Sequence, residues 1–189
     1  PANADLNPEK LWSYELSYSQ RLLQGQLSYG VNAFYIDGKD LIMRVPVDGR
    51  QMNVNTGKVE NAGVEAQVAY RLASAWSLDA NYSYLHMDNP VLASPEHKLY
   101  AGAAFSKGRW YVSTGCQYVA GLYTEVKVAG QGDYATEDFV LWNLRGSFRA
   151  LEWLNIWVRG ENLLARKYEI NAGFPMPKAT VMAGVNVRF

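Results

Sequence analysis

The sequence predicts an all-β protein whose strands form a transmembrane antiparallel β-barrel, and three observations lead to this fold class. Apolar and polar residues alternate along nine segments, and each apolar set spans about ten residues, which lets a tilted strand cross the hydrocarbon of a membrane. Charged residues fall almost entirely between the segments or on their polar sides. Connections alternate between short and long, as in outer-membrane barrels. A soluble β-sandwich ranks second. It explains the alternation of apolar and polar residues, but it explains neither the strand lengths nor the alternation of short and long connections.

The first four strands are expected at residues 11–20, 27–37, 62–70 and 76–84, where rings or aliphatic side chains alternate with small, polar or acidic residues. Their apolar positions are, in order, Trp12, Tyr14, Leu16 and Tyr18; Leu27, Tyr29, Val31, Ala33 and Tyr35; Ala62, Val64, Ala66, Val68 and Tyr70; and Trp76, Leu78, Ala80, Tyr82 and Tyr84. Pro46, Asp48-Gly49 and Asn55-Thr56-Gly57 predict a longer irregular stretch between the second and third strands.

Five more strands are expected at residues 98–106, 110–118, 140–149, 154–168 and 180–189. Their apolar positions are, in order, Leu99, Ala101, Ala103 and Phe105; Trp110, Val112, Thr114, Cys116 and Tyr118; Val140, Trp142, Leu144 and Phe148; Ile156 and Val158; and Val181, Ala183, Val185, Val187 and Phe189. Only Met182 breaks the alternation of the last strand. Turn-forming residues around Asn89-Pro90 and in the ranges 129–133 and 173–177 predict long loops.

The composition excludes several classes of function. The 189 residues carry 18 basic and 18 acidic side chains, so no basic surface points to a nucleic-acid partner. Thirteen tyrosines and six tryptophans suit a membrane interface, where Trp12, Trp76, Trp110 and Trp142 would form aromatic girdles. The single Cys116 cannot form an internal disulfide, and we expect it to face lipid. The sequence offers no nucleophile beside a histidine, so we do not expect an enzyme.

Four motifs occur in one order along the chain. Residues 160–168, Gly-Glu-Asn-Leu-Leu-Ala-Arg-Lys-Tyr, are followed by a Gly/Pro loop and a strand that ends in Phe. This arrangement resembles the C-terminus of the TonB-dependent receptor family. The stretch 7–16, the Gly-Val-Glu at 63–65 and the Pro-Glu-His at 95–97 resemble strand starts of the same family. The resemblance covers nearly the whole chain.

The resemblance implies a barrel of 22 strands that encloses an N-terminal plug carrying a TonB box. Residues 1–189 would then be the last nine strands, with the C-terminus in the periplasm. Because an odd number of strands cannot close a bacterial barrel, we expect the remainder of the receptor to supply the plug and the earlier strands. Outer-membrane lipid, the TonB complex and a surface lipoprotein are the other expected partners.

The implied function is energised import of a scarce nutrient, such as a ferric siderophore, haem or cobalamin, across the outer membrane of a Gram-negative bacterium. The alternative is a passive outer-membrane pore or a structural barrel. An outer-membrane hydrolase using His86 or His97 is a third possibility, and we rank it last. We expect no cofactor and no bound metal, because two loop histidines without a cysteine or a carboxylate arrangement make a thin ligand set.

Substrate contacts are expected in four external loops at residues 42–56, 88–96, 125–138 and 170–177. The weak candidates for these contacts are His86, His97, Tyr134 and Phe174. Six inner-face charges could line a transport path or pair with one another or with a plug, namely Glu65, Asp79, Arg145, Arg149, Arg159 and Glu161. The terminal residues Val185, Val187 and Phe189 resemble the signal that the barrel-assembly machinery reads.

Overall fold

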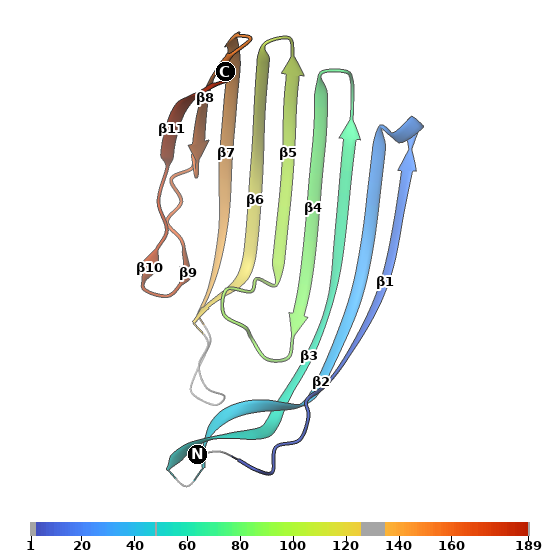
Figure 1. Cartoon of the computed structure of the whole chain (residues 1–189), viewed down its shortest axis with the longest axis vertical. Coiled ribbons are helices and arrows are strands. Elements are labelled where there is room, and N and C mark those ends of the chain that lie inside the picture. Colours follow the sequence, from blue (N-terminus) through green and yellow to red (C-terminus); the bar gives the residue numbers. More distant parts are fainter. Residues whose placement is uncertain (1–2, 48, 126–134, 189) are drawn as a thin grey trace.

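A computed structural model describes residues 3–47, 49–125 and 135–188 (Figure 1). Nine strands form one sheet in which each strand pairs antiparallel with the next along the chain, which confirms the all-β antiparallel prediction. They are β1 (Lys10–Leu22), β2 (Leu27–Val47), β3 (Arg50–Arg71), β4 (Trp76–Met87), β5 (His97–Lys107), β6 (Trp110–Glu125), β7 (Ala135–Leu151), β8 (Leu154–Glu161) and β11 (Thr180–Val187). A separate two-stranded sheet joins β9 (Glu169–Asn171) to β10 (Phe174–Pro175).

The sheet is open in the part of the chain that the structure describes, with β1 at one edge and β11 at the other. One short 3₁₀ helix, η1 (Leu23–Gly25), turns the chain from β1 into β2. No helix within the described residues is long and apolar enough to cross a membrane.

The strand register brings the apolar positions of neighbouring strands together on one face. Leu16 lies opposite Ala33, Ala33 opposite Val64, and Val64 opposite Tyr84. We call this the outer face, and the opposite one, which carries the polar positions, the inner face. Because paired residues of adjacent strands point to the same side, the face assignments made from the sequence are correct for these strands.

Rings on the outer face gather near both ends of the strands. Close to the tight turns, Trp76 packs on Phe105 with ring centroids 4.9 Å apart, and Trp110 packs on Phe148 at 4.5 Å. Tyr14 and Tyr35 form a corresponding pair near the other end, with centroids 6.4 Å apart. Aliphatic side chains lie between these pairs, which is the arrangement of an apolar band between two aromatic girdles. Trp142, which was expected in a girdle, instead lies in the middle of β7.

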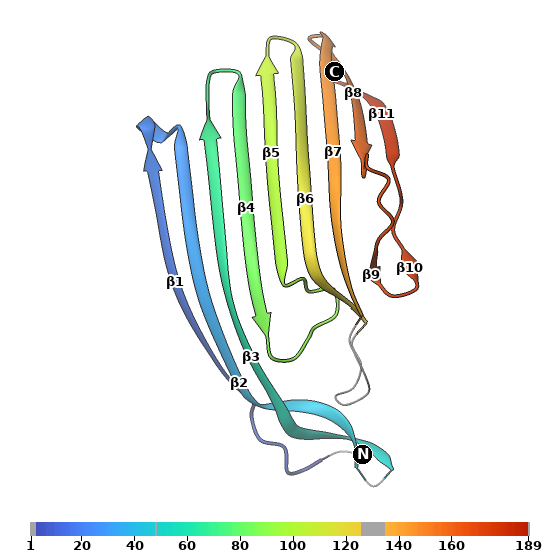
Figure 2. The same ribbon diagram turned by 180° about the vertical axis from the view of Figure 1, so that it is seen from behind.

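The two ends of the sheet differ in their connections (Figures 1 and 2). The connections β1–β2, β3–β4, β5–β6 and β7–β8 are short and lie at the end of the sheet where β11 also finishes. Longer connections or extended hairpins join β2–β3, β4–β5, β6–β7 and β8–β11 at the opposite end. The predicted alternation of short and long connections is therefore confirmed.

The irregular stretch expected after residue 37 is wrong, because most of it is regular strand. β2 continues to Val47, β3 starts at Arg50, and their pairing persists to the tip of a long hairpin. The irregularity is confined to register shifts between Gly38 and Ile42, where Asp40 has a φ of 57°. Beyond this bulge the hairpin bends sideways past the ends of the other strands (Figure 1), since bulges increase local bending and twist.

The eighth strand is shorter than the sequence predicted. β8 ends at Glu161 rather than near Tyr168, because Asn162 and Ala165 take left-handed conformations with φ of 49° and 52°. Two such residues close together turn the chain out of the strand, whereas the single one at Asp40 makes only a bulge in β2. The loop expected at residues 170–177 also has structure of its own, because the β9–β10 hairpin falls within it.

Candidate functional site

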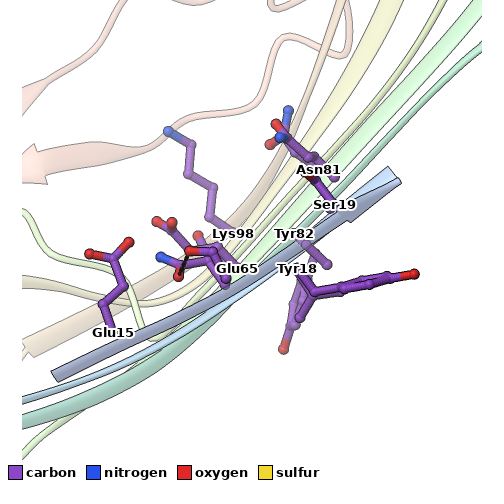
Figure 3. A pocket seen from close by; sticks show the side chains of 14 residues that line it. Glu15, Tyr18, Ser19, Glu65, Asn81, Tyr82 and Lys98 are labelled. Atoms are coloured by element: carbon purple, nitrogen blue, oxygen red, sulfur yellow. Dashed lines mark hydrogen bonds between the residues drawn. The ribbon is translucent and has the colours of Figure 1, made fainter. Parts of the chain in front are cut away.

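The middle of the inner face is a hydrophilic wall. A hollow of about 480 Å³ is lined by Glu15, Glu65, Asn81 and Lys98 together with small hydroxyl-bearing residues. Figure 3 shows these polar side chains on one side of the sheet and the rings of Tyr18 and Tyr82 on the other. The strands pair through their backbone groups, so the polar side chains project from the sheet into the hollow. The wall can therefore line an aqueous lumen.

The six inner-face charges singled out from the sequence are spread over several hollows. Asp79, Arg145, Arg159 and Glu161 line one hollow of about 260 Å³, where Arg159 Nε lies 3.3 Å from Glu161 Oε1. The other two lie elsewhere. Glu65 belongs to the hollow of Figure 3, and Arg149 lines a third one near the tight turns. The charged side chains therefore form separate patches along the inner wall.

Toward the long-connection end, the inner face of β2–β4 becomes apolar. The residues concerned, which we call the mouth surface, are Phe34, Ile36, Leu41, Met43, Val45, Met52, Val54 and Leu85. Most of them are half-buried, and Met43 is exposed. The hairpin register sets Met43 opposite Val54 and Val45 opposite Met52, so one face of the hairpin is apolar.

Two glycines show that the mouth surface is continuous from the sheet into the hairpin. The ring of Phe34 lies over Gly63, where a Cβ would collide with it. At Gly57, a Cβ would lie 2.6 Å from Cβ of Leu41 and 3.0 Å from Cγ of Met43. Both side chains therefore cover the glycine on the same side of the ribbon. Glycine at these positions lets the apolar side chains lie flat against the backbone.

At the same end of the sheet, β6 and β7 also carry apolar residues on the inner face, and here the chain covers them. Val119, Leu122 and Phe139 are buried beneath Tyr168 and Ile170. The Phe139 and Tyr168 rings lie 4.3 Å apart. Ala172 N donates to Thr124 O at 2.9 Å, which ties this covering segment to β6. We call residues 162–172 the covering segment.

The start of the covering segment is fixed by a buried side chain, Asn162. Its Nδ2 donates to Arg166 O at 2.8 Å and to Pro177 O at 3.1 Å, while its Oδ1 accepts from Arg166 N at 3.0 Å. Its own backbone N–H donates to Asn143 Oδ1 at 2.9 Å. Asn162 is only 5% exposed, so these bonds satisfy a group that water cannot reach. Sequence reasoning noticed the motif around Asn162 but gave this residue no role.

The comparisons with known proteins agree with this architecture. The family model described as "TonB dependent receptor-like, beta-barrel" matches residues 1–163. The chain belongs to this family. No curated protein matches the sequence.

Solved structures of TonB-dependent receptors share the fold of the chain. The FrpB iron transporter from Neisseria meningitidis has a TM-score of 0.82 at 17% identity, with 100% of this chain and 32% of that chain covered. The ferric-catecholate import receptor Fiu from E. coli K12 has a TM-score of 0.76 at 19% identity, with 99% of this chain and 29% of that chain covered. The copper transporter OprC has a TM-score of 0.74 at 20% identity, with 98% of this chain and 32% of that chain covered. The chain therefore spans about a third of the length of these receptors.

In this receptor barrel the two histidines lie on the outer face. His97 Nδ1 lies 2.8 Å from Tyr82 Oη, and the His97 and Tyr84 rings pack with centroids 5.0 Å apart. His86 pairs with Ala62 in the register, and its Nε2 lies 3.6 Å from Asp88 Oδ1. Both histidines belong to the ring-bearing exterior, and the structure does not bring them onto the inner wall. The alternation in the sequence predicts this position. His86 lies an even number of residues from Tyr84, and His97 lies an even number of residues from Leu99, and both of these point outward.

The other candidates are dispersed. Phe174 is 72% exposed on β10, and Tyr134 lies outside the described residues. Val185 and Val187 are exposed on the outer face of the edge strand β11, while Phe189 lies outside the described residues. Within the described ranges, no three His, Cys, Asp or Glu side chains group as a metal site would require.

Proposed function

We propose that these strands form the C-terminal part of the barrel of a TonB-dependent transporter. The transporter imports a scarce nutrient across the outer membrane of a Gram-negative bacterium, with ferric siderophores, haem and cobalamin as the substrate classes. The observation that carries the proposal is the match of residues 1–163 to the receptor barrel family. The relatives named above, which transport iron or copper by their titles, support the same class of function.

The proposal assigns a direction to the sheet. Short connections of outer-membrane barrels face the periplasm and longer ones face outward. The end of β11 would then lie at the periplasmic side, and the β2–β3 hairpin and the covering segment at the external side. Residues 1–189 would supply the final nine strands, and the remainder of the receptor would supply the other strands and the plug that contacts the TonB complex.

The two faces divide the work of such a transporter. The ring-bearing outer face holds the strands in lipid, since every backbone polar group must be paired inside a membrane. The inner wall presents carboxylates, amides and one ammonium group to an aqueous lumen. Substrate binding would use the external loops and the mouth of the lumen, and energy from the inner membrane would drive release. A surface lipoprotein would act at the same external side.

The face assignment is tested by two adjacent substitutions in the full receptor. Leu16→Arg places a charge in the apolar band, where it costs roughly 2–4 kcal/mol of folding free energy. Ser17→Arg, one residue away on the inner face, should cost far less, because its hydrogen bond to Asn32 spans an exposed polar wall. Folding in lipid vesicles, followed by urea titration, measures both. Equal costs for the two variants would contradict a lipid-facing outer side.

The transport function is tested in cells that lack the receptor and carry it on a plasmid. Uptake of ⁵⁵Fe as a panel of ferric siderophores, of haem and of cobalamin is measured with and without a protonophore. Receptor-dependent uptake that stops when the proton gradient collapses is the expected result. Receptor-dependent uptake that survives the protonophore would instead establish a passive pore.

A further inference from the structure

We propose that four side chains on the inner face near the tight turns, Arg149, Asn155, Asn186 and Arg188, bind a phosphate group. We call these four residues the corner site, because they lie where β7 ends, β8 begins and β11 ends (Figure 1). The inference goes beyond the proposed function, since the ligand is distinct from a transported nutrient.

The strand register brings the corner site together. Arg149 of β7 lies opposite Asn155 of β8, and Asn155 lies opposite Asn186 of β11. Arg188 follows two residues after Asn186, and its backbone N–H donates to Trp153 O at 3.0 Å, which keeps it beside the β7–β8 turn. Paired residues, and alternate residues of one strand, share a face of the sheet. The two guanidinium groups therefore flank the two amides on the inner face.

The corner site lines a hollow of about 240 Å³. Glu152, Trp153 and Leu154 complete its lining. Sites for whole small molecules usually measure about 300–1,000 Å³, so this hollow suits a single small chemical group. Two guanidinium groups against one carboxylate leave the hollow with a net positive charge, which favours an anion.

The nitrogen donors of the corner site have no partner in the part of the chain that the structure describes. There, neither arginine forms an ion pair, even with Glu152, and none of the four side chains makes a hydrogen bond. Cations elsewhere are paired, since Arg159 Nε lies 3.3 Å from Glu161 Oε1 and Lys39 Nζ lies 2.9 Å from Asp37 Oδ2. The corner site therefore keeps its donors for a ligand.

An unpaired arginine alone is not sufficient evidence for a site. Arg21 is also exposed near a tight turn and has no ion pair with a described residue, but no second cation lines its hollow. The corner site differs because two arginines and two amides share one hollow. This difference makes Arg21 the matched control below.

Phosphate fits these donors better than a carboxylate does. A guanidinium group presents its N–H donors as a fork that matches two phosphate oxygens. Neighbouring strands lie about 4.8 Å apart, so the donors of the corner site converge from three strands that together span about 10 Å. A carboxylate has two oxygens in one plane, whereas phosphate oxygens point to the corners of a tetrahedron and can accept from all three strands. Inorganic phosphate and a phospholipid headgroup both carry this group.

The first arm of the test titrates inorganic phosphate into the purified full receptor by calorimetry, in a phosphate-free detergent at constant ionic strength. Arg149→Gln and Arg188→Gln should each weaken binding about tenfold or more, because hydrogen bonds to charged groups contribute more than neutral ones. Arg21→Gln removes the same charge from another hollow and should leave the affinity unchanged. This result supports the corner site with free phosphate as its ligand.

The second arm replaces the free anion by a lipid. The receptor is folded into phosphatidylcholine vesicles with and without phosphatidylglycerol, and the midpoints of urea unfolding are compared. If phosphatidylglycerol stabilises the parent and Arg21→Gln, but neither Arg149→Gln nor Arg188→Gln, the corner site binds the phosphate of a lipid headgroup.

A change of shape-matched side chains tests the corner site without removing an arginine. Asn155→Asp places a carboxylate between the two guanidinium groups, where it takes up their donors. It should abolish phosphate binding in whichever arm shows it, while the receptor still folds. Asn81→Asp introduces the same charge on the inner face of β4, in another hollow, and should leave phosphate binding unchanged.

Two outcomes overturn the inference. Absence of binding in both arms would do so, including the case in which another part of the receptor already fills the hollow. Equal weakening by Arg21→Gln and Arg149→Gln would also do so, because the effect would then be a general attraction of anions to positive charge. Neither outcome affects the proposed transport function, which the uptake measurement tests separately.

Discussion

Near the long connections, the inner face of the sheet is apolar in two regions, the β2–β3 hairpin and β6–β7, and the two regions are built differently. On β6–β7, Phe139 and its neighbours are buried beneath a segment that follows them within the next few dozen residues. On the β2–β3 hairpin, no segment among the described residues covers Met43 and its neighbours in this way. The difference teaches that the inner face near the long connections is apolar both where a neighbouring segment buries it, as at Phe139, and where no described segment does, as at Met43. The predictions below test each half of that comparison.

The largest effect is expected at Phe139. Phe139→Ala removes the ring of a residue that is 6% exposed and packed against the tilted ring of Tyr168, which should cost roughly 3–5 kcal/mol of unfolding free energy. Phe34→Ala removes a half-buried ring from the mouth surface. If nothing else covers that surface, the loss of unfolding free energy should be less than about half of the loss for Phe139→Ala. Urea titration of both variants in lipid vesicles measures the difference. Equal losses in the full receptor would show that the mouth surface is as well covered as the other.

The next effect concerns the side chain that holds the covering segment. Asn162→Ala breaks three side-chain hydrogen bonds to the backbone of Arg166 and Pro177, which should cost roughly 1–3 kcal/mol. The segment should loosen, and trypsin should then cleave after Arg166 or Lys167. Asn162→Gly is the matched control for the positive φ, because glycine tolerates that conformation. If only the alanine variant is cleaved, backbone strain and not hydrogen bonding holds the segment.

A smaller effect is expected where residues 3–9 lie along the hairpin. Asn55→Ala removes the side chain that bonds both to Asn7 and to Asp40 O, which should cost roughly 1–2 kcal/mol locally. Asn53→Ala is the control, since Asn53 uses its backbone oxygen for the contact with Asn3. Hydrogen exchange of residues 3–9 should rise in the first variant alone. A rise in both would show that the segment is held by something other than Asn55.

The smallest effect is electrostatic. Lys58 Nζ lies 2.8 Å from Glu60 Oε2, beyond the Tyr14–Tyr35 ring pair at the long-connection end, and this bond lowers the pKa of Glu60 and raises the pKa of Lys58. The depressed carboxyl contributes stability above its ordinary pKa of 4.5, and that stability is lost as pH falls through the folded pKa. The raised ammonium contributes below its ordinary pKa of 10.5 and loses its contribution as pH rises through its folded pKa.

This electrostatic prediction is checked by titrating the Glu60 carboxyl by NMR in the parent and in Lys58→Met. The pKa of Glu60 should move up toward its ordinary value in the variant, though not fully, because Tyr35 Oη still donates to Glu60 Oε1 at 2.7 Å. An unchanged pKa would show that the lysine does not hold the carboxylate in solution.

Much of the fold follows from alternation in the sequence. A period of two is unambiguous over strands such as residues 76–84, so the faces, the antiparallel order and the tight turns were all predictable. The long hairpin was missed because turn-forming residues at Pro46 and Gly57 outweighed the alternation of Met43 and Val45. The bulge near Asp40 also shifts which residues of β2 point to each face, so a strict alternation cannot be followed through it.

The candidate site was predicted less well than the fold. Parity alone places His86 and His97 on the outer face, yet their position beside a loop suggested an external ligand role. The function of Asn162 depends on partners four and fifteen residues away and on a left-handed backbone, and neither leaves a periodic signal. Contacts between the covering segment and β6–β7 are tertiary and were beyond any pattern in the sequence.

The direction of the two border strands carries a consequence for the whole receptor. Counting along the meander, β1 and β11 run the same way, so joining them directly would make parallel neighbours. An antiparallel ring needs an odd number of intervening strands, and the one beside β11 must set out from the side where β11 stops. Because an odd number of strands crosses the bilayer an odd number of times, the completing strands would begin on the side where β11 stops and end on the opposite side, where β1 begins.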